Sequence, residues 1–546
     1  MHAHAEQRTE PDLRPAEDPL VASQSGIRGD WLAMLPGLSA YAVLAFAFSA
    51  FVTDDALITL RYARQWAAGH GIRWNVGEDP VEGFTNFSHV ALGAAALYAG
   101  LPALTVVRAF NVLASLGAVA IAYALAQRAL DDRRFAGAAA LLVGAHSASA
   151  YWSVSGLETS SYAALLLLGM WALDSGRVWL AGAALLLAAI TRMEGAVAAL
   201  AIGGAYVGVD LLRNTGSALR RHAPWACAWL LCYGAYFAWR WHYFGHPISN
   251  SAYFKTRGDP DAALVLDFMK QAAPVLLLMP LAPYRKLGAL GLSCLALVAV
   301  YFIGYYGVRP SVSYLHRFFV PVYAPAVLLA VSALWRVWRA AGERRRWSIA
   351  VAAAFATVLT WDLVNPYCGV ARAAAQTKDK GARMVSRARV AAFIAEGYGA
   401  SVRVLVQDVG VIGYALQNPI IDSFGLNSEA YTHTFQRKRR RYLQAVLETR
   451  PDVLVLVTKH ANELVPQYMT DDAISKQAAF TEYRRVHVVR SASERYHYMI
   501  YAHEALARGQ ATRRPARIVV DASTSTARML EATASAIWAA QEASSH

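Results

Sequence analysis

Three observations predict a polytopic α-helical membrane protein with a C-terminal α/β domain. Of the 546 residues, 56% are hydrophobic and 16% are charged, and the mean hydropathy is +0.28, whereas soluble domains carry about 25% charged residues. Apolar runs recur from residue 31 to about 363. Beyond about residue 370, short β-rich runs alternate with helix-like stretches. This pattern excludes an ordinary soluble enzyme, a disordered chain and a collagen-like fibre.

The apolar runs predict about eleven transmembrane helices. The first run, Trp31 to Val52, is too long and lies too far along the chain for a cleaved signal peptide, so we expect it to be retained. The segment 88–101 is short for a span and suits an interfacial or re-entrant helix. The other runs lie at 105–127, 135–151, 159–174, 178–191, 195–212, 224–242, 263–282, 287–307, 319–338 and 347–363.

Basic residues orient this topology. If 88–101 is not a span, the basic clusters between the spans share one side, which the positive-inside rule makes cytoplasmic. The N-terminus is then inside, and the first periplasmic loop, 53–104, and the chain after about 364 are outside. The clusters are Arg128/Arg133/Arg134, Arg177, Arg213/Arg220/Arg221, Arg285/Lys286 and Arg336/Arg339/Arg344/Arg345/Arg346.

Three segments follow from these patterns. Residues 1–30 are polar and are expected to form a disordered cytoplasmic tail, and residues 31–365 form the transmembrane domain. Residues 370–546 are expected to form an extracytoplasmic α/β domain with a mostly parallel sheet, because of β-rich runs such as 402–407 and 453–457. The last 35 or so residues suit a terminal helix or a frayed end.

The net charge and the cysteines add little chemistry. The net charge of +14 suits cytoplasmic loops and anionic headgroups in the lipid bilayer. It comes with no basic helix or stacking motif, so no nucleic-acid partner is expected. The four cysteines form no CxxC motif, so neither a disulfide framework nor a zinc site is predicted.

A pair of carboxylates follows the first span. Asp54 and Asp55 begin a predicted helix that ends near Gly69. A carboxylate pair at membrane depth is costly, and its default interpretation is a functional site. The alternative is that Thr53 or Asp54 is an N-cap. A carboxylate with limited water around it can accept a proton from a hydroxyl group. We therefore expect Asp54 and Asp55 to be catalytic.

Basic side chains on the predicted outer ends of the spans suit a phosphate group. Arginine can bind phosphate in a bidentate manner, and lysine binds it as a point charge. Taken singly, each of these residues also suits snorkelling to lipid headgroups. The candidates for phosphate contacts are Arg61, Arg64, Arg192, Arg240, Lys255, His316 and Arg317.

Further polar residues on this side are candidates for binding a sugar or an acceptor. For Glu158, at the start of a predicted span, an N-cap role is the alternative. His242 and His246 have a spacing compatible with a metal, but Gly245 and Pro247 break a helix there, so no metal site is predicted. No spacing demands a divalent cation as cofactor, and that question stays open. The sugar or acceptor candidates are Tyr62, Glu82, Asn86, Glu158, Glu194, Asn250 and Tyr253.

The run 53–64, TDDALITLRYAR, followed by Gly69-His-Gly71 and the run 81–86, VEGFTN, resembles the GT-C membrane glycosyltransferases. The resemblance is greatest to the AftB-type terminal arabinofuranosyltransferases and the related pilin arabinosyltransferases of bacteria. It extends over roughly residues 50 to 430. Weaker similarities to the family lie at 155–159, 191–195, 243–255, 317–321, 408–414 and 421–427.

The resemblance implies a GT-C fold in the bacterial inner membrane and an active site on the extracytoplasmic side. It implies inverting transfer of D-arabinofuranose from a polyprenyl-phosphate donor, such as decaprenylphosphoryl arabinose, to a glycan or a pilin-like protein of the cell envelope. Asp54 would be the base, and Asp55 would orient the acceptor. The alternatives are transfer of mannose or another hexose, a polytopic transporter or flippase, and an anchor for the α/β domain. The absence of an internal repeat weakens the transporter interpretation.

Overall fold

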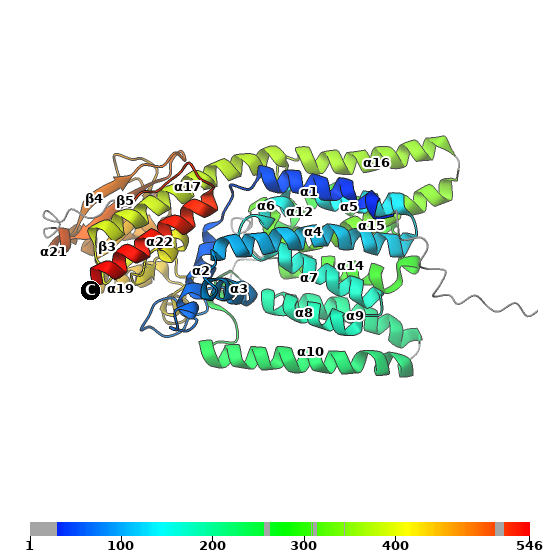
Figure 1. The fold of residues 1–546 in the computed structure, drawn as a ribbon, viewed down its shortest axis with the longest axis horizontal. Helices are drawn as coiled ribbons and strands as arrows, with labels where there is room; N and C mark the ends of the chain where they lie inside the picture. The colour runs from blue at the N-terminus through cyan, green and yellow to red at the C-terminus, as the bar shows by residue number, and fades with distance from the viewer. Residues whose placement is uncertain are drawn as a thin grey trace, which may run out of the picture.

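A helical bundle and a C-terminal α/β part make up the protein (Figure 1). The computed structural model describes residues 30–545 except 214, 256–261, 307, 309–313, 343 and 508–517. The predicted tail, apart from Asp30, therefore lies outside the described residues, as do the side chains of Phe254 and Lys255.

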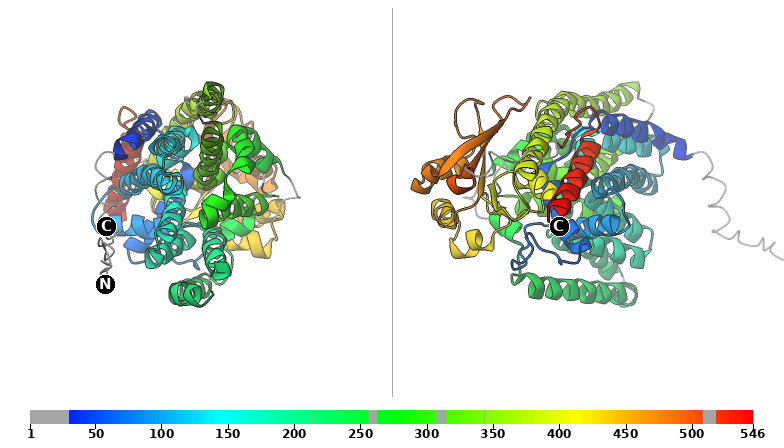
Figure 2. Two further views of the ribbon diagram at one scale, coloured as in Figure 1. Left: turned by 90° about the vertical axis from the view of Figure 1, so that its right-hand side faces the viewer. Right: turned by 60° about the vertical axis from the view of Figure 1, so that its left-hand side comes forward.

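The bundle is built from helices that follow the apolar runs closely. Figure 2 (left) views it along its length, with many of the helices seen end-on. The elements are η1 Asp30–Met34, α1 Leu35–Ala47, α2 Asp54–Ala67, α3 Phe87–Tyr98, α4 Ala103–Leu130, α5 Arg133–Ala145, α6 Ser147–Ser153, α7 Thr159–Asp174, α8 Val178–Thr191, α9 Gly195–Arg213, α10 Thr215–Phe244, α11 Asn250–Lys255, α12 Ala263–Gln271, α13 Ala273–Leu278, η2 Met279–Leu281, α14 Tyr284–Gly304, η4 Tyr314–Phe319, α15 Val320–Ala341 and α16 Arg345–Val364.

The predicted count of eleven spans is not confirmed. Each predicted run contains a helix or a pair of helices, but in the described residues only α4, α9, α14, α15 and α16 are long and apolar enough to cross a membrane. A sixth span results if α12 and the following α13–η2 segment, bent by 78°, count as one. Helices α5, α7 and α8 would extend only about 20–24 Å at 1.5 Å per residue, less than the roughly 30 Å of a bilayer core. Helix α3 has 12 residues and is shorter than a span, as expected for 88–101.

Helix α15 is the centre of the bundle, and α16 is at its edge. In the 18-residue apolar stretch of Tyr314–Ala341, which contains α15, every residue is buried. In the corresponding stretch of α16 only 17% of the residues are buried. Helix α15 packs against α5, α7, α14 and α16. The face of α16 that the protein leaves open is therefore available to lipid.

Two of the basic clusters hold helix ends together. The Nε atom of Arg128 lies 2.8 Å from Oδ2 of Asp174, which joins the ends of α4 and α7. The Lys286 ammonium lies 4.0 Å from the ring centroid of Trp335, which joins the start of α14 to the last turns of α15. Figure 1 shows the α15–α16 turn at the end of the bundle away from the sheet.

The C-terminal part is a mixed sheet covered by helices. The strand order is β2-β1-β3-β5-β4, in which β1 is parallel to β2 and β3, and β5 is antiparallel to β3 and β4. The prediction of a mostly parallel sheet is thus wrong for half of the strand pairs, because β4 and β5 form a hairpin that adds to the sheet by its β5 edge. The elements are α17 Val370–Gly397, β1 Val404–Val406, α18 Val409–Ala415, β2 Ile420–Asp422, η5 Ala430–Thr434, α19 Arg439–Glu448, β3 Val453–Thr458, α20 Met469–Ser475, η6 Ala478–Glu482, β4 Tyr483–Val489, β5 His497–His503, α21 Glu504–Ala507 and α22 Thr526–Ser545.

The two predicted strands and the terminal helix are present. Strand β1 lies within the run predicted at 402–407, and β3 covers the run predicted at 453–457. Every residue of β3 is buried, as expected for a strand covered on both faces. Helix α22 packs against α17 and α18, and α18 packs against α2. The helices α2 and α18 therefore join the bundle to the sheet.

Candidate active site

A cavity of about 210 Å³ lies where the start of α2, the η4 segment and the C-terminal part meet. The acidic residues in its wall include Asp54 and Asp55, both predicted to be catalytic, and Asp408. The basic ones are Lys380 and Arg387, both from α17. The cavity thus combines proton acceptors with cations, and its wall comes from both parts of the chain.

Asp54 caps a distant helix rather than its own. Its Oδ2 accepts a hydrogen bond of 3.0 Å from the amide of Gly410, and its Oδ1 accepts one of 2.9 Å from the amide of Val411. Thr53, the N-cap of α2, makes no side-chain capping bond. Thr53 therefore occupies the N-cap position as the alternative has it, but neither its side chain nor that of Asp54 caps α2. Instead, the Asp54 carboxylate holds the start of α18 against α2.

This contact requires a glycine at position 410. A Cβ atom on Gly410 would lie 2.0 Å from the backbone oxygen of Asp54 and 2.5 Å from its Cγ. Both distances are far below van der Waals contact, and the nearest atom belongs to the backbone. A larger residue would have to push α18 away from Asp54.

Arg387 connects Asp54 to a second buried carboxylate. Its Nη2 lies 3.0 Å from Oδ2 of Asp408, and its Nη1 lies 3.6 Å from Oδ1 of Asp54. Oδ2 of Asp408 also accepts hydrogen bonds of 2.5 and 2.7 Å from the hydroxyls of Tyr496 and Tyr498.

These surroundings push the two pKa values in opposite directions. Burial raises the pKa of Asp54, and the amides and Arg387 offset this only in part. Burial also disfavours the charged form of Asp408, but Arg387 and the tyrosine hydroxyls outweigh it and lower the pKa of Asp408. Asp54 is consequently the more basic carboxylate of the two.

Asp55 begins a chain of charges that runs into the bundle. Its side chain is 54% exposed, and its Oδ2 lies 3.5 Å from Nη1 of Arg317. Nη2 of Arg317 lies 3.2 Å from Oε1 of Glu158, which Nη1 of Arg192 also contacts. The Nε of Arg192 in turn pairs with Glu194. The structure therefore brings five of the predicted site residues into one network.

Glu158 is the centre of that network. Its Oε2 accepts a hydrogen bond of 2.8 Å from the amide group of Asn86, and its side chain makes no capping bond to α7. Burial acts to raise its pKa, but Arg317 and Arg192 outweigh this effect and hold the pKa of Glu158 at about 2. Glu158 therefore stays ionised and fixes both arginines, and the N-cap alternative does not describe its side chain.

Arg61 does not lie at the cavity. Its side chain is fully buried, and all five of its N–H groups are engaged. The acceptors are the backbone oxygens of Trp74, Gly413, Leu416 and Asn418 and the side-chain oxygen of Asn75. No N–H group remains for a phosphate, so the expectation for Arg61 is corrected: it joins α2 to the residues that end α18.

Arg64 also lies in the interface between the two parts. Its Nη1 donates a hydrogen bond of 2.6 Å to the Tyr414 oxygen, and its guanidinium lies 3.8 and 4.5 Å from the rings of Tyr414 and Trp538. Burial lowers its pKa. Unlike Arg61, Arg64 has N–H groups beyond this one bond, so its phosphate role stays a prediction.

None of the predicted phosphate ligands with described side chains lines the cavity, and Arg317 reaches it only through its contact with Asp55. Nη1 of Arg240 pairs with Oε2 of Glu82 at 2.5 Å, and both side chains are buried. Burial raises the pKa of Glu82 to about 7. His316 is buried beside Phe268, and the side chain of Lys255 lies outside the described residues.

Two predicted sugar-binding residues, Tyr62 and Asn250, support the loop 424–428, and a third, Tyr253, lies beside Arg437. The Tyr62 hydroxyl contacts the Asn427 side chain at 3.0 Å. Nδ2 of Asn250 donates to the backbone oxygens of Gly425, Leu426 and Ser428. The ring of Tyr253 lies 4.2 Å from the Arg437 guanidinium. Phe424 and Leu426 of this loop line the cavity, so Tyr62 and Asn250 shape the cavity wall indirectly.

Lys380, Arg387 and Asp408 were not predicted as site residues. Lys380 and Arg387 lie seven residues apart on α17 and so share one face, a periodicity that the sequence displays. The Lys380 ammonium lies 4.7 Å from the ring of Tyr314. Burial, with help from Arg383 and Arg387, lowers the pKa of Lys380 to about 8. Among the described residues, no group of three or more His, Cys, Asp or Glu side chains is arranged to hold a metal ion.

Comparison with solved structures identifies the fold. ArnT from Cupriavidus metallidurans bound to undecaprenyl phosphate matches with a TM-score of 0.56 and 15% identity, over 86% of this chain and 98% of ArnT. ArnT in the apo state matches with a TM-score of 0.54 and 13% identity, over the same shares of both chains. The chain has the ArnT fold. The predicted GT-C fold class is therefore confirmed.

Comparisons of the sequence add less. Residues 373–501 match a family described as a domain of unknown function, DUF8728. No curated protein matches the chain. The matched range begins within α17 and ends within β5, so it includes Lys380, Arg387 and Asp408 of the cavity wall.

Proposed function

We propose that the protein is a GT-C glycosyltransferase that moves a sugar from a polyprenyl-phosphate donor to an acceptor outside the cytoplasm. The observation that carries the proposal is the cavity in which Asp54 and Asp55 face Lys380 and Arg387. A base and a cationic site are what transfer from a lipid phosphate requires. ArnT, which shares the fold, has been captured with undecaprenyl phosphate.

Each step of an inverting transfer has a candidate group. The acceptor hydroxyl attacks the anomeric carbon, and Asp54 takes the proton as the new C–O bond forms. The bond between that carbon and the phosphate oxygen breaks, and its electron pair leaves with the polyprenyl phosphate. The raised pKa of Asp54 suits proton removal. Lys380 and Arg317 stabilise the charge on the leaving phosphate.

Asp55 has a different task in this scheme. It is more exposed than Asp54 and touches Arg317, so it can orient the acceptor while Arg317 holds the phosphate. The network behind Arg317, through Glu158 to Arg192, fixes the guanidinium in place. A charged group that is already oriented needs no reorganisation during the reaction.

The proposed sugar and acceptor rest on the resemblance of the sequence to a known family. The run 53–64 and its companions resemble the AftB-type enzymes, so we propose D-arabinofuranose as the sugar, and a glycan or a pilin-like protein as the acceptor. The basic clusters lie at the end of the bundle away from the sheet, which supports a bacterial inner-membrane protein with the cavity and the C-terminal part extracytoplasmic.

The test uses the purified full chain in lipid nanodiscs. Synthetic decaprenylphosphoryl arabinose and a decaprenylphosphoryl mannose are supplied with an arabinofuranose oligosaccharide or a pilin-type peptide, and transfer is followed by mass spectrometry. We expect transfer of arabinose, and Asp54→Asn should lower the rate by about 10²- to 10⁴-fold, the usual contribution of a general base. Transfer of mannose alone would change the sugar but keep the enzyme class.

Asp55→Asn is the matched variant, because it removes a neighbouring carboxylate but leaves the amides of Gly410 and Val411 their acceptor. It should retain more activity per folded molecule than Asp54→Asn, whose side-chain NH2 would face one of these backbone amides. If Asp54→Asn transfers sugar at the wild-type rate, the base assignment fails. Movement of a fluorescent lipid-linked sugar across proteoliposomes, without any transfer, would establish the flippase alternative instead.

A further inference from the structure

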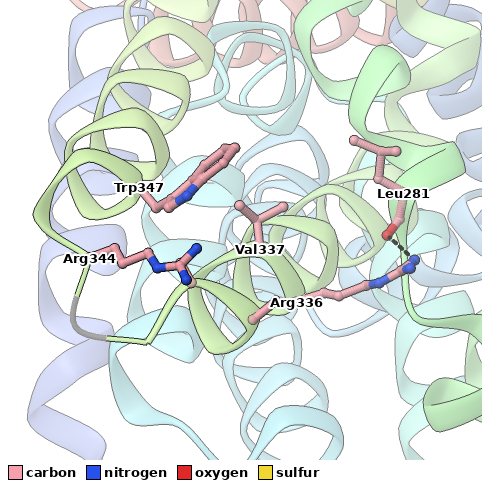
Figure 3. Close-up of a pocket in the computed structure, with 7 residues that line it drawn as sticks. Leu281, Arg336, Val337, Arg344 and Trp347 are labelled. Atoms are coloured by element: carbon pink, nitrogen blue, oxygen red, sulfur yellow. Dashed lines mark hydrogen bonds between the residues drawn. The ribbon is translucent and has the colours of Figure 1, made fainter.

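A second cavity, of about 390 Å³, lies at the other end of the bundle (Figure 3). Its wall comes from the last turns of α15, the start of α16 and the residue that ends η2. Arg336, Val337, Arg344, Trp347 and Leu281 are among the residues that line it. Helix α16 leads from this cavity towards α17 over 20 residues, or about 30 Å. The two cavities are therefore separate sites.

The wall of this cavity combines two arginines, Arg336 and Arg344, with apolar side chains that lie beside and between them (Figure 3). Nη1 of Arg336 donates a hydrogen bond of 3.2 Å to the backbone oxygen of Leu281, which fixes the guanidinium at the rim. Arg344 and Trp347 are exposed at the turn, and Val337 faces the cavity from α15. The wall includes no carboxylate among the residues that the structure describes. The described wall therefore offers positive charge to an anion.

The surroundings strengthen the positive potential. Lys286 and Arg339 stack on the ring of Trp335 at 4.0 and 5.6 Å. Arg345 and Arg346 follow the cavity residues in sequence and are exposed. The acid in this stretch is Glu343, whose placement lies outside the described residues. Basic pockets between transmembrane helices are a known setting for anionic lipid headgroups.

We propose that this cavity binds an anionic phospholipid. The phosphate would be held by Arg336 and Arg344, whose planar guanidinium groups match phosphate oxygens in a bidentate manner. The Trp347 indole would lie at headgroup depth, as amphipathic rings do at membrane interfaces. An acyl chain would cover Val337 and Leu281, which a free phosphate ion would leave exposed. The apolar wall therefore selects a lipid as the occupant.

Such a lipid would stabilise the α15–α16 hairpin. Helix α16 is the least buried of the five spanning helices, so the rest of the protein holds it only weakly. A phospholipid wedged between α15 and α16 adds contacts on both sides of the turn. This role is separate from the proposed transfer, because none of these residues lines the cavity of Asp54.

Native mass spectrometry of the full chain in detergent tests the proposal. The probes are phosphatidylglycerol and phosphatidylcholine of matched acyl chains, added at equal concentrations, with inorganic phosphate as a competitor. We expect at least fivefold greater retention of phosphatidylglycerol, and at least fivefold loss of that retention in Arg336→Gln/Arg344→Gln. The double variant Arg345→Gln/Arg346→Gln removes the same charge next to the cavity, at the start of α16, and should retain the lipid as the wild type does.

A third variant covers the case in which the first fails to fold. Val337→Trp fills the cavity but keeps every arginine, and it should also lose the lipid. Equal losses in the two charge variants, or full retention in Val337→Trp, would overturn the site, since either result points to diffuse charge. Equal retention of both phospholipids by the wild type, or displacement by millimolar phosphate, would overturn the choice of an anionic lipid.

Discussion

Two buried arginines in this protein differ in what they bind, and the difference separates structure from chemistry. Arg61 donates all five N–H groups to uncharged oxygens, two in the loop that follows α2 and three at or just after the end of α18. Arg317 pairs with carboxylates, and one of them, Asp55, belongs to the cavity wall. An arginine saturated by carbonyl groups holds two parts of a protein together. An arginine shared between carboxylates beside a cavity can accept an incoming anion.

The largest effect is expected from Arg61→Met. It leaves several buried oxygens without a donor, so the free energy of unfolding should fall by about 3 kcal/mol or more. Thermal unfolding in detergent and protease sensitivity of the C-terminal part would measure the loss. Arg64→Met, which removes one carbonyl contact and two ring contacts, should cost less. A stable but inactive Arg61→Met protein would return Arg61 to the phosphate site.

The next effect sharpens the contrast by keeping the charge. Arg317→Lys should lower kcat/KM by about 10- to 100-fold, because a lysine cannot span Glu158, Asp55 and a phosphate at once. The melting temperature should change little, since a cation still faces Glu158. Arg61→Lys should behave in the opposite way, with a lower melting temperature and a smaller loss of activity per folded molecule. If the two variants respond alike, the distinction between the two arginines is wrong.

Lys380 should give the cavity a pH dependence that Arg61 cannot give the interface. Lysine is charged below its pKa and neutral above it, so with a pKa of about 8 the donor phosphate loses one contact as the pH rises from 7 to 9. KM for the donor should then rise by up to about tenfold over that range. Lys380→Arg should flatten this profile because arginine stays charged. An unchanged profile would remove Lys380 from the phosphate site.

The smallest effect is expected at the basic end of the bundle. Arg128 and Asp174 form an exposed ion pair, which typically contributes about 0–1 kcal/mol. Arg128→Gln and Asp174→Asn should each shift the melting temperature by only a degree or two, and less at high salt. A loss of stability as large as that of Arg61→Met would show that the number and burial of an arginine's partners do not determine its contribution to stability.

The sequence predicted the helices better than their lengths. Apolar runs locate helices because each run must be buried in protein or in lipid. They do not reveal a bend such as the one of 78° between α12 and α13, nor that α5 and α8 end after 13 and 14 residues. The strand directions of the mixed sheet were also not predictable from the apolar runs. The direction of β5 depends on its hairpin with β4, which the sequence of β3 does not indicate.

The site was predictable where position along the spans sufficed. Asp55, Glu158, Arg192 and Arg317 converge because each lies at a helix end that the topology places on the same side. The role of Arg61 was mistaken because most of its partners lie about 350 residues further along the chain. Lys380, Arg387 and Asp408 were missed for the same reason: docking between distant segments leaves no local signal.

The hydrogen bonds from Gly410 and Val411 to Asp54 also have a consequence for biosynthesis. Ribosomes complete α2 early and reach residue 411 only after the last spanning helix has been made. During that interval the acidic pair has neither its amide donors nor the cations of α17. A nascent chain, or one truncated before α17, would therefore lack the assembled cavity around Asp54.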